Sequence, residues 1–329
     1  MRVAVVGVGA IGGFIGARLG LLPDVQVSAL ARGATLQALQ SHGLRLRQGG
    51  EVLSAPVRAS AQAADLGEQD LVIIAVKAPA LAAVAAGIAP LLGPHTVVLP
   101  AMNGVPWWFG EALPALGRQP LAAVDPDGAI AAAIPFAQVL GCVVHASCFT
   151  EAPGVATHVM GRGLIVGEPL GASQASSARA EALVALLDRA GFEATLSADV
   201  RRDAWYKLWG NMTMNPITAI TGATVDKVLD DPLTRQLCTR AMSEAQAVGA
   251  AIGCEITQTP EDRHQITRKL GAFKTSMLQD VEAGRAIELD ALVSAVHEIA
   301  QRVGVDTPFI GALLGLTRLR GQVLGLYPA

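Results

Sequence analysis

The stretch MRVAVVGVGAIGGFIGARLG, residues 1–20, decides how the first half of the chain is interpreted. The apolar run from Val3 to Val6 is typical of a buried strand, and three glycines follow it at the spacing G-x-G-x-x-G. Apolar residues then recur at helical spacing up to Leu19. Glycines at this spacing, between a strand and a helix, indicate a dinucleotide-binding βαβ unit.

Each glycine has its own expected role. Gly7 permits the tight turn, Gly9 lets the backbone approach a pyrophosphate, and Gly12 allows the helix and the strand to pack closely. The phosphates would then lie at the positive end of the helix. The residues predicted to line this loop are Gly7, Val8, Gly9, Ala10, Ile11 and Gly12.

Two other interpretations of the opening stretch stay open. An apolar N-terminus followed by Ala29-Leu30-Ala31 resembles a secretory signal with its cleavage site, although Arg18 interrupts the apolar run and Pro23 follows it. A tight turn that binds no ligand is the second alternative. The strand and the helix on either side of the glycines favour nucleotide binding.

The end of the second expected strand, Val25 to Leu30, indicates which dinucleotide binds. In NAD sites an Asp or Glu here usually holds the ribose 2′-hydroxyl. This chain has Ala31-Arg32-Gly33 instead. Because a guanidinium pairs well with a 2′-phosphate, we expect Arg32 to favour NADP(H); a solvated loop arginine is the alternative.

Length and composition suit a two-domain enzyme. The 329 residues exceed what one hydrophobic core usually supports. The net charge of −3 predicts no basic face for nucleic acid, and beyond the opening stretch no apolar run predicts a membrane span. The four cysteines lack C-x-x-C spacing, so we expect buried free thiols and no metal site. These features predict a cytoplasmic protein.

Strand-like runs alternate with alanine-rich helical stretches through the first half of the chain. Strands are expected at residues 71–76, 96–99, 139–144 and 164–166, with a helix that ends at about residue 92. This alternation predicts a mainly parallel sheet that binds ligands at the carboxyl ends of its strands. Lys77 and Asn103 follow two of these strands, so we expect both to contact the cofactor.

From about residue 199 the strand patterns fade and long helical patterns replace them. The predicted fold class is therefore α/β, with a Rossmann-type parallel-sheet domain at residues 1–197 and an all-helical domain at residues 198–329. We expect the first domain to bind NADP and the second to carry the substrate-binding and catalytic residues.

Three polar residues recur in the helical stretch RRDAWYKLWGNMTMNPITAITGAT, which begins at residue 201. Lys207, Asn211 and Asn215 are four residues apart, so they lie within about 80° on one helix face. Their neighbours are large and apolar, and Asn is a poor residue for an exposed helix, so a functional stripe is favoured over a solvated one. Pro216 is expected to bend or end this helix.

A second polar stretch, KTSMLQDVEAGRAIELDALV from residue 274, contains Ser276 and Glu288. On one continuous helix these residues would lie roughly 18 Å apart along the axis. Gly284 offers a break, after which Glu288 would open a new helix. The alternative is that Glu288 serves only to interact with the helix dipole.

Together these motifs resemble the ketopantoate reductase family (2-dehydropantoate 2-reductase) over nearly the whole chain. They are the glycine fingerprint, ARG after the second strand, AVK, NG after a later strand, KLWGN…NP, and TSMLQDVEAGRAIELD. The resemblance implies NADPH-dependent reduction of a 2-oxo acid to a D-2-hydroxy acid. The family's own reaction is the reduction of ketopantoate to pantoate in pantothenate biosynthesis.

The resemblance also implies a role for each site residue. Lys207 matches the family's catalytic lysine, and Glu288 matches its acidic partner near the reacting carbonyl and the cofactor. Asn211, Asn215 and Ser276 match substrate contacts, and Arg32, Lys77 and Asn103 match cofactor-side residues, Asn103 being expected to contact the substrate as well. Family members can carry a further substrate Asn after the NP helix, where this chain has TGATVDK, so the particular 2-oxo acid stays open.

The chemistry of the reaction supports the same assignment. A hydride that arrives at a keto carbon puts negative charge on the oxygen, so the site needs a positioned donor. Lys207 is the better candidate because none of the six histidines has a convincing acidic partner. We expect the substrate to bind between the two domains.

Three other functions remain as alternatives to this reductase. They are a non-catalytic NADPH-binding redox sensor, a reductase of a different small 2-oxo acid, and a 3-hydroxy acid dehydrogenase. The sequence leaves the oligomeric state open, with a homodimer among the states considered.

Overall fold

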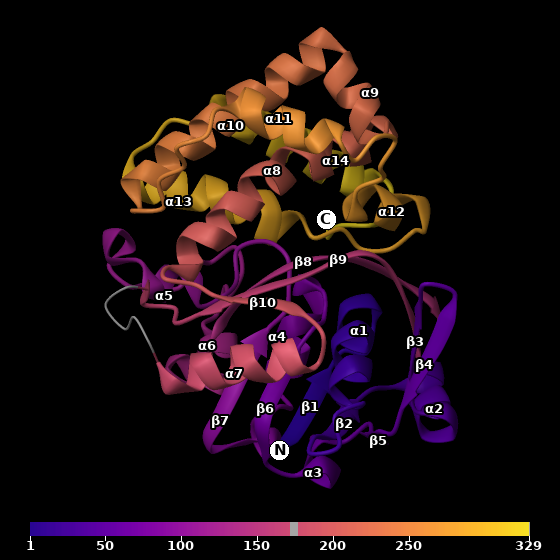
Figure 1. Cartoon of the computed structure of the whole chain (residues 1–329). Helices are drawn as coiled ribbons and strands as arrows, with labels where there is room; N and C mark the ends of the chain where they lie inside the picture. Colours follow the sequence, from indigo (N-terminus) through magenta and orange to yellow (C-terminus); the bar gives the residue numbers. More distant parts are fainter. Residues whose placement is uncertain (172–176, 329) are drawn as a thin grey trace. The chain divides into compact units, whose positions relative to one another are not determined.

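The computed structural model describes residues 1–171 and 177–328 (Figure 1). Its internal contacts divide the chain into two compact units. Unit 1 comprises Met1–Met102 and Asp127–Asp203, and unit 2 comprises Asn103–Pro126 and Ala204–Ala329. The segment Asn103–Pro126 therefore packs with the C-terminal helices, although more of unit 1 follows it in the sequence.

Unit 1 is built on a parallel sheet of five strands. They are β1 (Arg2–Val6), β2 (Gln26–Leu30), β5 (Arg58–Ser60), β6 (Gln69–Ile74) and β7 (Leu92–Pro100). Their spatial order is β5-β2-β1-β6-β7, and every pairing is parallel. The order reverses direction at β1, which is the Rossmann arrangement, and ligands bind outside the carboxyl ends of the strands at such a point. The expected N-terminal fold is thus confirmed.

A second sheet of unit 1 differs from the expectation of one mainly parallel sheet. It contains β3 (Leu44–Gln48), β4 (Glu51–Ala55), β8 (Gly141–Ala152), β9 (Val155–Gly167) and β10 (Glu193–Leu196). Strands β3 and β4 form one antiparallel hairpin and β8 and β9 another, while β9 pairs in parallel with β3 and β10. Two hairpins make the antiparallel pairs, since short turns connect only antiparallel neighbours.

Helix α1 (Ala10–Leu19) packs against strands of both sheets. A Cβ on Gly16 would lie 3.1 Å from Val5 of β1 and 3.3 Å from Leu44 of β3, and one on Gly13 would lie 3.0 Å from Ala156 of β9. Glycine at these positions lets the backbone of α1 approach two layers at once. The helix is consequently buried along most of its length, with Phe14 in the core.

The remaining helices of unit 1 span three to five residues each, except α2 (Gly33–His42) and α7 (Ala178–Arg189). The short ones are α3 (Ala63–Leu66), η1 (Ala78–Ala80), α4 (Leu81–Ala85), η2 (Ala89–Leu91), α6 (Ala129–Ala133) and η4 (Phe136–Gln138). The prediction of one continuous helix up to about residue 92 is therefore wrong, because η1, α4 and η2 divide this stretch into short pieces. Pro79 and Pro90 each lie in a separate 3₁₀ turn, because proline is tolerated in the first turn of a helix but not in its interior.

Unit 2 is helical, as expected. Its elements are α5 (Phe109–Ala112), η3 (Pro114–Leu116), α9 (Val225–Asp230), α10 (Pro232–Ala251), α11 (Pro260–Arg268), α12 (Ser276–Glu282), the π-helix η6 (Asp290–Ser294), α13 (Ala295–Val303) and α14 (Pro308–Val323), together with most of α8 (Val200–Thr221). Helix α8 does not end at Pro216 but continues through it to Thr221.

Packing within unit 2 explains why Asn103–Pro126 belongs to it. The Glu298 carboxylate of α13 accepts hydrogen bonds from the backbone N–H groups of Ala122 (2.9 Å) and Ala123 (2.7 Å). The ring of Phe109 stacks on Trp205 of α8, with ring centroids 6.0 Å apart. These contacts join α5 and the loop after η3 to the helices of the second half of the chain.

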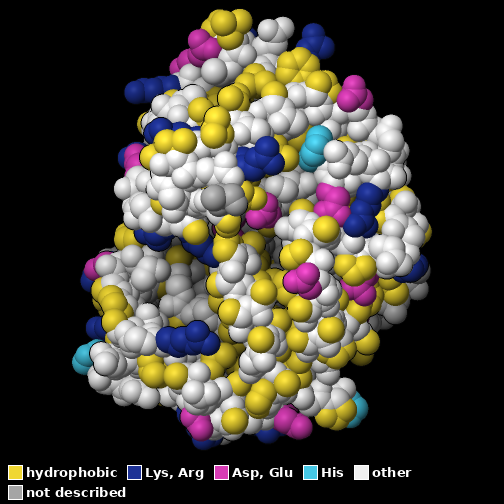
Figure 2. Space-filling model, turned by 180° about the vertical axis from the view of Figure 1, so that it is seen from behind, with side chains coloured by type: hydrophobic (Ala, Val, Ile, Leu, Met, Phe, Trp, Pro, Cys, Tyr) yellow, Lys and Arg dark blue, Asp and Glu magenta, His cyan; other side chains and the backbone are white. Residues whose placement is uncertain are grey.

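The polar surface and the thiols agree with the composition. On the face shown in Figure 2, Lys and Arg side chains are interspersed with Asp and Glu, as expected for 25 basic and 28 acidic residues. All four cysteines are free thiols; Cys148 is half-buried and the other three are buried. The expectation of free thiols is thus confirmed, with Cys148 less buried than expected.

Candidate active site

The glycine loop follows the end of β1 in unit 1. Gly7 has a φ of +91°, and a Cβ there would lie 2.5 Å from Val76, so the turn requires glycine. A Cβ on Gly12 would lie 2.0 Å from the carbonyl oxygen of Gly7, so strand and helix approach as closely as the sequence predicts.

The start of α1 is suited to a pyrophosphate. Gly9 is the N-cap residue, and no side chain caps the first turn of the helix, which also carries no acidic residue. A Cβ on Gly9 would meet only the Thr150 hydroxyl, at 4.0 Å, so there is open space in front of this backbone. Uncapped N–H groups at the positive end of a helix bind phosphate well, and a side chain at Gly9 would occupy that space.

Arg32 and Lys77 lie at the carboxyl ends of the two strands that flank β1. Arg32 follows β2 and is the N-cap of α2, and Lys77 follows β6 and is the N-cap of η1. Both side chains are exposed. The loop after β1 and these two cations thus share the edge of the sheet where Rossmann folds bind nucleotides.

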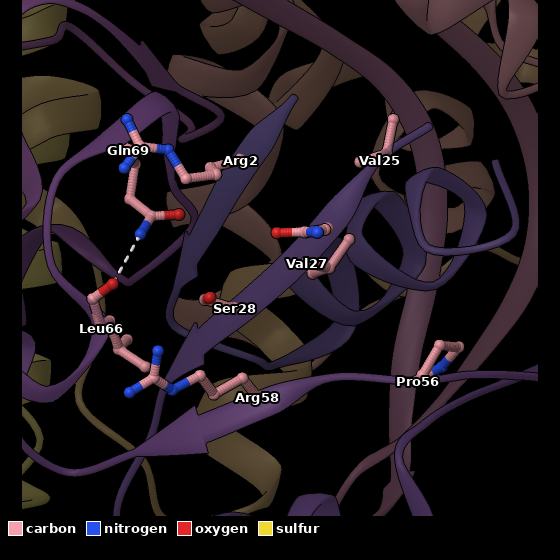
Figure 3. A pocket seen from close by; sticks show the side chains of 9 residues that line it. Arg2, Val25, Val27, Ser28, Pro56, Arg58, Leu66 and Gln69 are labelled. Carbon is pink, nitrogen blue, oxygen red and sulfur yellow. Dashed lines mark hydrogen bonds between the residues drawn. The ribbon is translucent and has the colours of Figure 1, made fainter. Parts of the chain in front are cut away.

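A cavity in unit 1 lies at the opposite edge of this sheet, where the strands begin (Figure 3). Its volume is about 330 Å³, and its lining comprises Arg2, Val25, Gln26, Val27, Ser28, Pro56, Arg58, Leu66 and Gln69. Arg2 is the first residue of β1, whereas Gly7 follows its last. The amide of Gln69 donates to the carbonyl oxygens of Leu66 (3.0 Å) and Gly67 (2.9 Å) beside this cavity. The cavity is therefore separate from the glycine loop.

In unit 2 the ammonium of Lys207 on α8 donates a hydrogen bond of 2.8 Å to Oδ1 of Asn103. Asn103 is half-buried and lies in the segment after β7. The two residues are 104 positions apart in the sequence. Since Oδ1 faces Lys207, the amide fixes the position of the ammonium by a charge-assisted hydrogen bond.

The polar stripe of α8 has a second contact. Nδ2 of Asn215, a buried residue, donates a long hydrogen bond of 3.4 Å to Oγ of Ser276, the first residue of α12. Next to it, the hydroxyls of Thr218 and Thr275 are 2.6 Å apart. Asn211 lies between Lys207 and Asn215 on α8 and is half-buried. The structure thus brings Lys207 to Asn103 and Asn215 to Ser276.

Glu288 lies beyond the break that the sequence predicts. Helix α12 ends at Glu282, Gly284 has a φ of +62°, and the chain becomes helical again at Leu289. Glu288 is half-buried and directly precedes this second helical stretch. The residue therefore precedes the N-terminus of that helix, the end at which a negative charge is stabilised.

Sequence reasoning missed the residues that hold the Asn103 loop. Gly104 has a φ of +83°, and a Cβ there would lie 2.6 Å from both Cβ and the carbonyl oxygen of Ala291. The N–H of Val105 donates to that same carbonyl, at 2.7 Å. The NG dipeptide predicts a turn, but its partner Ala291 is too distant in the sequence to be found from a local pattern.

Two family models cover most of the chain. The model described as "Ketopantoate reductase PanE/ApbA" matches residues 3–171, and "Ketopantoate reductase PanE/ApbA C terminal" matches residues 199–321. Together with the parallel sheet and its glycine loop, these matches define an oxidoreductase of the Rossmann class. More narrowly, the chain belongs to the ketopantoate reductase family, which consists of NADP-dependent oxidoreductases.

Similar proteins cover the chain from end to end. A 2-dehydropantoate 2-reductase of Mesorhizobium japonicum is 44% identical over 99% of this chain and 100% of its own length. One from Halobacterium salinarum is 28% identical over 97% of this chain and 98% of its own. The crystal structure of a Ralstonia solanacearum protein, provisionally called a ketopantoate reductase, is 56% identical with a TM-score of 0.94 over 99% of both chains. None of the described helices is long and apolar enough to cross a membrane.

Proposed function

We propose that the protein reduces 2-dehydropantoate, or a closely similar small 2-oxo acid, to the D-2-hydroxy acid with NADPH. The observation that carries this proposal is the hydrogen bond between Lys207 and Asn103, which holds an ammonium in place on the face of α8 that also carries Asn211 and Asn215. The names of the relatives support the oxo acid as substrate.

The residues of unit 1 fit NADP(H). The uncapped start of α1 and the open space at Gly9 suit the pyrophosphate, and Arg32 suits a 2′-phosphate. Lys77 adds a second cation at the same edge of the sheet. When bound, the reduced nicotinamide supplies the hydride that the keto carbon receives.

The residues of unit 2 fit the oxo acid. The ammonium of Lys207, held by Asn103, is the proposed donor of a hydrogen bond and then of a proton to the keto oxygen. The Ser276 hydroxyl accepts from Asn215 and keeps its own O–H for a substrate carboxylate oxygen. Glu288 offsets part of the positive charge and orients the substrate.

An assay of NADPH oxidation with a panel of 2-oxo acids, ketopantoate included, tests the proposed function. The expected result is turnover of ketopantoate or a close analogue, with NADPH preferred to NADH. A protein that binds NADPH but reduces no acid of the panel would contradict the proposal and would favour the redox sensor.

We also propose that the protein forms a homodimer through α14. Phe309, Leu316, Leu319 and Val323 are 40% to 72% exposed and follow the a/d spacing of a heptad repeat. A two-fold axis would bring the same stripe of a second copy against this one, and each copy would cover the apolar side chains of the other. Light scattering should give the dimer mass for the parent and the monomer mass for Leu319→Glu; a monomeric parent at all concentrations would contradict this proposal.

A further inference from the structure

The helix that follows Glu288 opens with a π turn. In η6 the N–H of Ala295 donates to the carbonyl of Asp290, five residues earlier, so this N–H does not bond the Ala291 carbonyl as it would in an α-helix. The Ala291 carbonyl instead accepts from the N–H of Val105, at 2.7 Å. The π turn thus provides the acceptor that holds the loop of Asn103.

The loop that carries Asn103 packs so tightly against Ala291 that the π turn determines the position of the loop. With glycine at residue 104, the backbone lies directly against Ala291, where a Cβ would come within 2.6 Å. Asn103, the preceding residue, accepts the hydrogen bond from Lys207. A displacement of η6 would therefore move Asn103 and, through it, the ammonium of Lys207.

The C-terminal segment is hydrogen-bonded to Asp290, the first residue of η6, next to Ala291. The Tyr327 hydroxyl donates a hydrogen bond of 2.5 Å to Oδ1 of Asp290, which also accepts from Ser294 at 3.0 Å. Three residues before Asp290, the N–H of Ile287 donates to the carbonyl of Leu326, at 3.1 Å. Glu288 lies between these two points of attachment.

Packing against α14 and the protonation state of Tyr327 both favour a stable contact between the C-terminal segment and η6. A Cβ on Gly321 of α14 would lie 2.8 Å from Cβ of Tyr327 and 3.0 Å from Ile287, so glycine lets the tail lie flat on the helix. Burial and the neighbouring Asp290 carboxylate raise the pKa of Tyr327 to about 12. The phenol consequently stays a hydrogen-bond donor at working pH.

We propose that Tyr327 and Asp290 are positioning residues for the reduction: their hydrogen bond holds η6, and η6 sets the positions of Glu288 and of the Asn103–Lys207 pair. This inference rests on the function proposed above. It assigns the C-terminal segment a role in turnover, although neither residue needs to touch the substrate.

Tyr327→Phe removes only the hydroxyl and is the test variant. Small misplacements of reacting groups cost large factors in rate, so we expect kcat to fall about tenfold or more, with KM and NADPH affinity within about twofold of the parent. Hydrogen exchange at the Val105 amide should become faster. Gln322→Ala is the matched control, because it removes a hydrogen bond to the carbonyl of Pro328 in the same tail and not one to Asp290, and it should change none of these quantities.

Two further variants separate positioning from general stability. Asp290→Asn retains an oxygen that accepts from Tyr327 and should keep most of the kcat that Asp290→Ala loses. Parental kcat in Tyr327→Phe, or unchanged exchange at Val105, would overturn the inference. If the parent reduced no 2-oxo acid, the proposed function would fail, while the exchange comparison would still decide whether Tyr327 holds the loop.

Discussion

Arg32 is the residue on which the choice of cofactor depends. It is exposed at the end of β2, where NAD-binding sheets usually carry an acid. A charge-assisted contact with the 2′-phosphate contributes roughly 1.5–3 kcal/mol, so Arg32→Ala should narrow the preference for NADPH over NADH by about one to two orders of magnitude.

Steady-state kinetics with both cofactors would measure this preference. Arg58→Ala is the matched control, because Arg58 is an arginine of the same sheet that lines the cavity at its opposite edge. Equal catalytic efficiency of the parent with NADPH and NADH would show that Arg32 is only a solvated residue.

Single residues were predictable where a helix repeat brings them together. The spacing of Lys207, Asn211 and Asn215 indicates a shared face of α8. In the structure, Lys207 and Asn215 each form a side-chain hydrogen bond with a residue of another element. The sequence did not predict that Asn103 and Ser276 are those partners, since both come from elements far away in the sequence.

At the scale of elements, an added methyl group should have different effects at two glycines of the nucleotide loop: lower stability at Gly12 and weaker NADPH binding at Gly9. Gly12→Ala would place a Cβ 2.0 Å from the Gly7 carbonyl, so we expect destabilisation of about 1–3 kcal/mol, the usual cost of overpacking. Gly9→Ala has open space and should unfold like the parent, but its methyl group would occupy the phosphate position and weaken NADPH binding.

Thermal unfolding and NADPH titration of both variants measure these two effects. A Gly9→Ala variant with parental NADPH affinity would place the pyrophosphate elsewhere. A Gly12→Ala variant as stable as the parent would mean that α1 can shift away from β1 at little cost.

The second sheet shows which elements a search for apolar strands overlooks. Strand β3 alternates buried Leu44 and Leu46 with polar arginines, and Gly49-Gly50, both with positive φ, form the turn into β4. Alternation around a Gly-Gly pair is a hairpin signal that was available in the sequence. The pairing of β9 with both β3 and β10 was not available, because it depends on contacts between distant segments.

At the scale of the whole molecule, acid should destabilise unit 1 through Glu168. The Glu168 side chain is 6% exposed, and its carboxylate accepts hydrogen bonds from Arg179 at 2.8 and 2.6 Å. Burial alone would raise the pKa of Glu168, but hydrogen bonds from Arg179 and Ser177 outweigh it and lower the pKa. This contribution to stability is complete above the pKa of an unfolded Glu, about 4.3, and is lost as the pH falls through the lower folded value.

Arg179→Ala would leave that carboxylate buried without its main partner. We expect the free energy of unfolding to fall by about 3 kcal/mol at pH 7. On acidification from pH 7 to pH 4 it should then fall by less than in the parent. Arg47→Ala is the control, since the pair between Arg47 and Glu151 is exposed and should contribute little. Urea unfolding at pH 7 and pH 4 measures both; equal stability of Arg179→Ala and the parent at pH 7 would contradict this role.

The division into units was only partly accessible from the sequence. The change from strand to helix patterns near residue 199 lies close to the boundary at Asp203–Ala204. The membership of Asn103–Pro126 in unit 2 depends on contacts made by Glu298, Phe109 and Trp205. The longest of them joins residues 176 positions apart, so these contacts leave no local pattern.

The turnover of Lys207→Ala tests the central claim most directly. Lys207 is proposed to donate the proton and stabilise the developing alkoxide, so its loss should lower kcat about 10²–10⁴-fold. NADPH binding, followed by fluorescence, should stay close to that of the parent, because the glycine loop and Arg32 are unchanged. Ser276→Ala, the companion variant, should mainly raise KM for the oxo acid. A Lys207→Ala enzyme with near-parental kcat would contradict the mechanism and leave Lys207 as a residue that only packs beside Asn103.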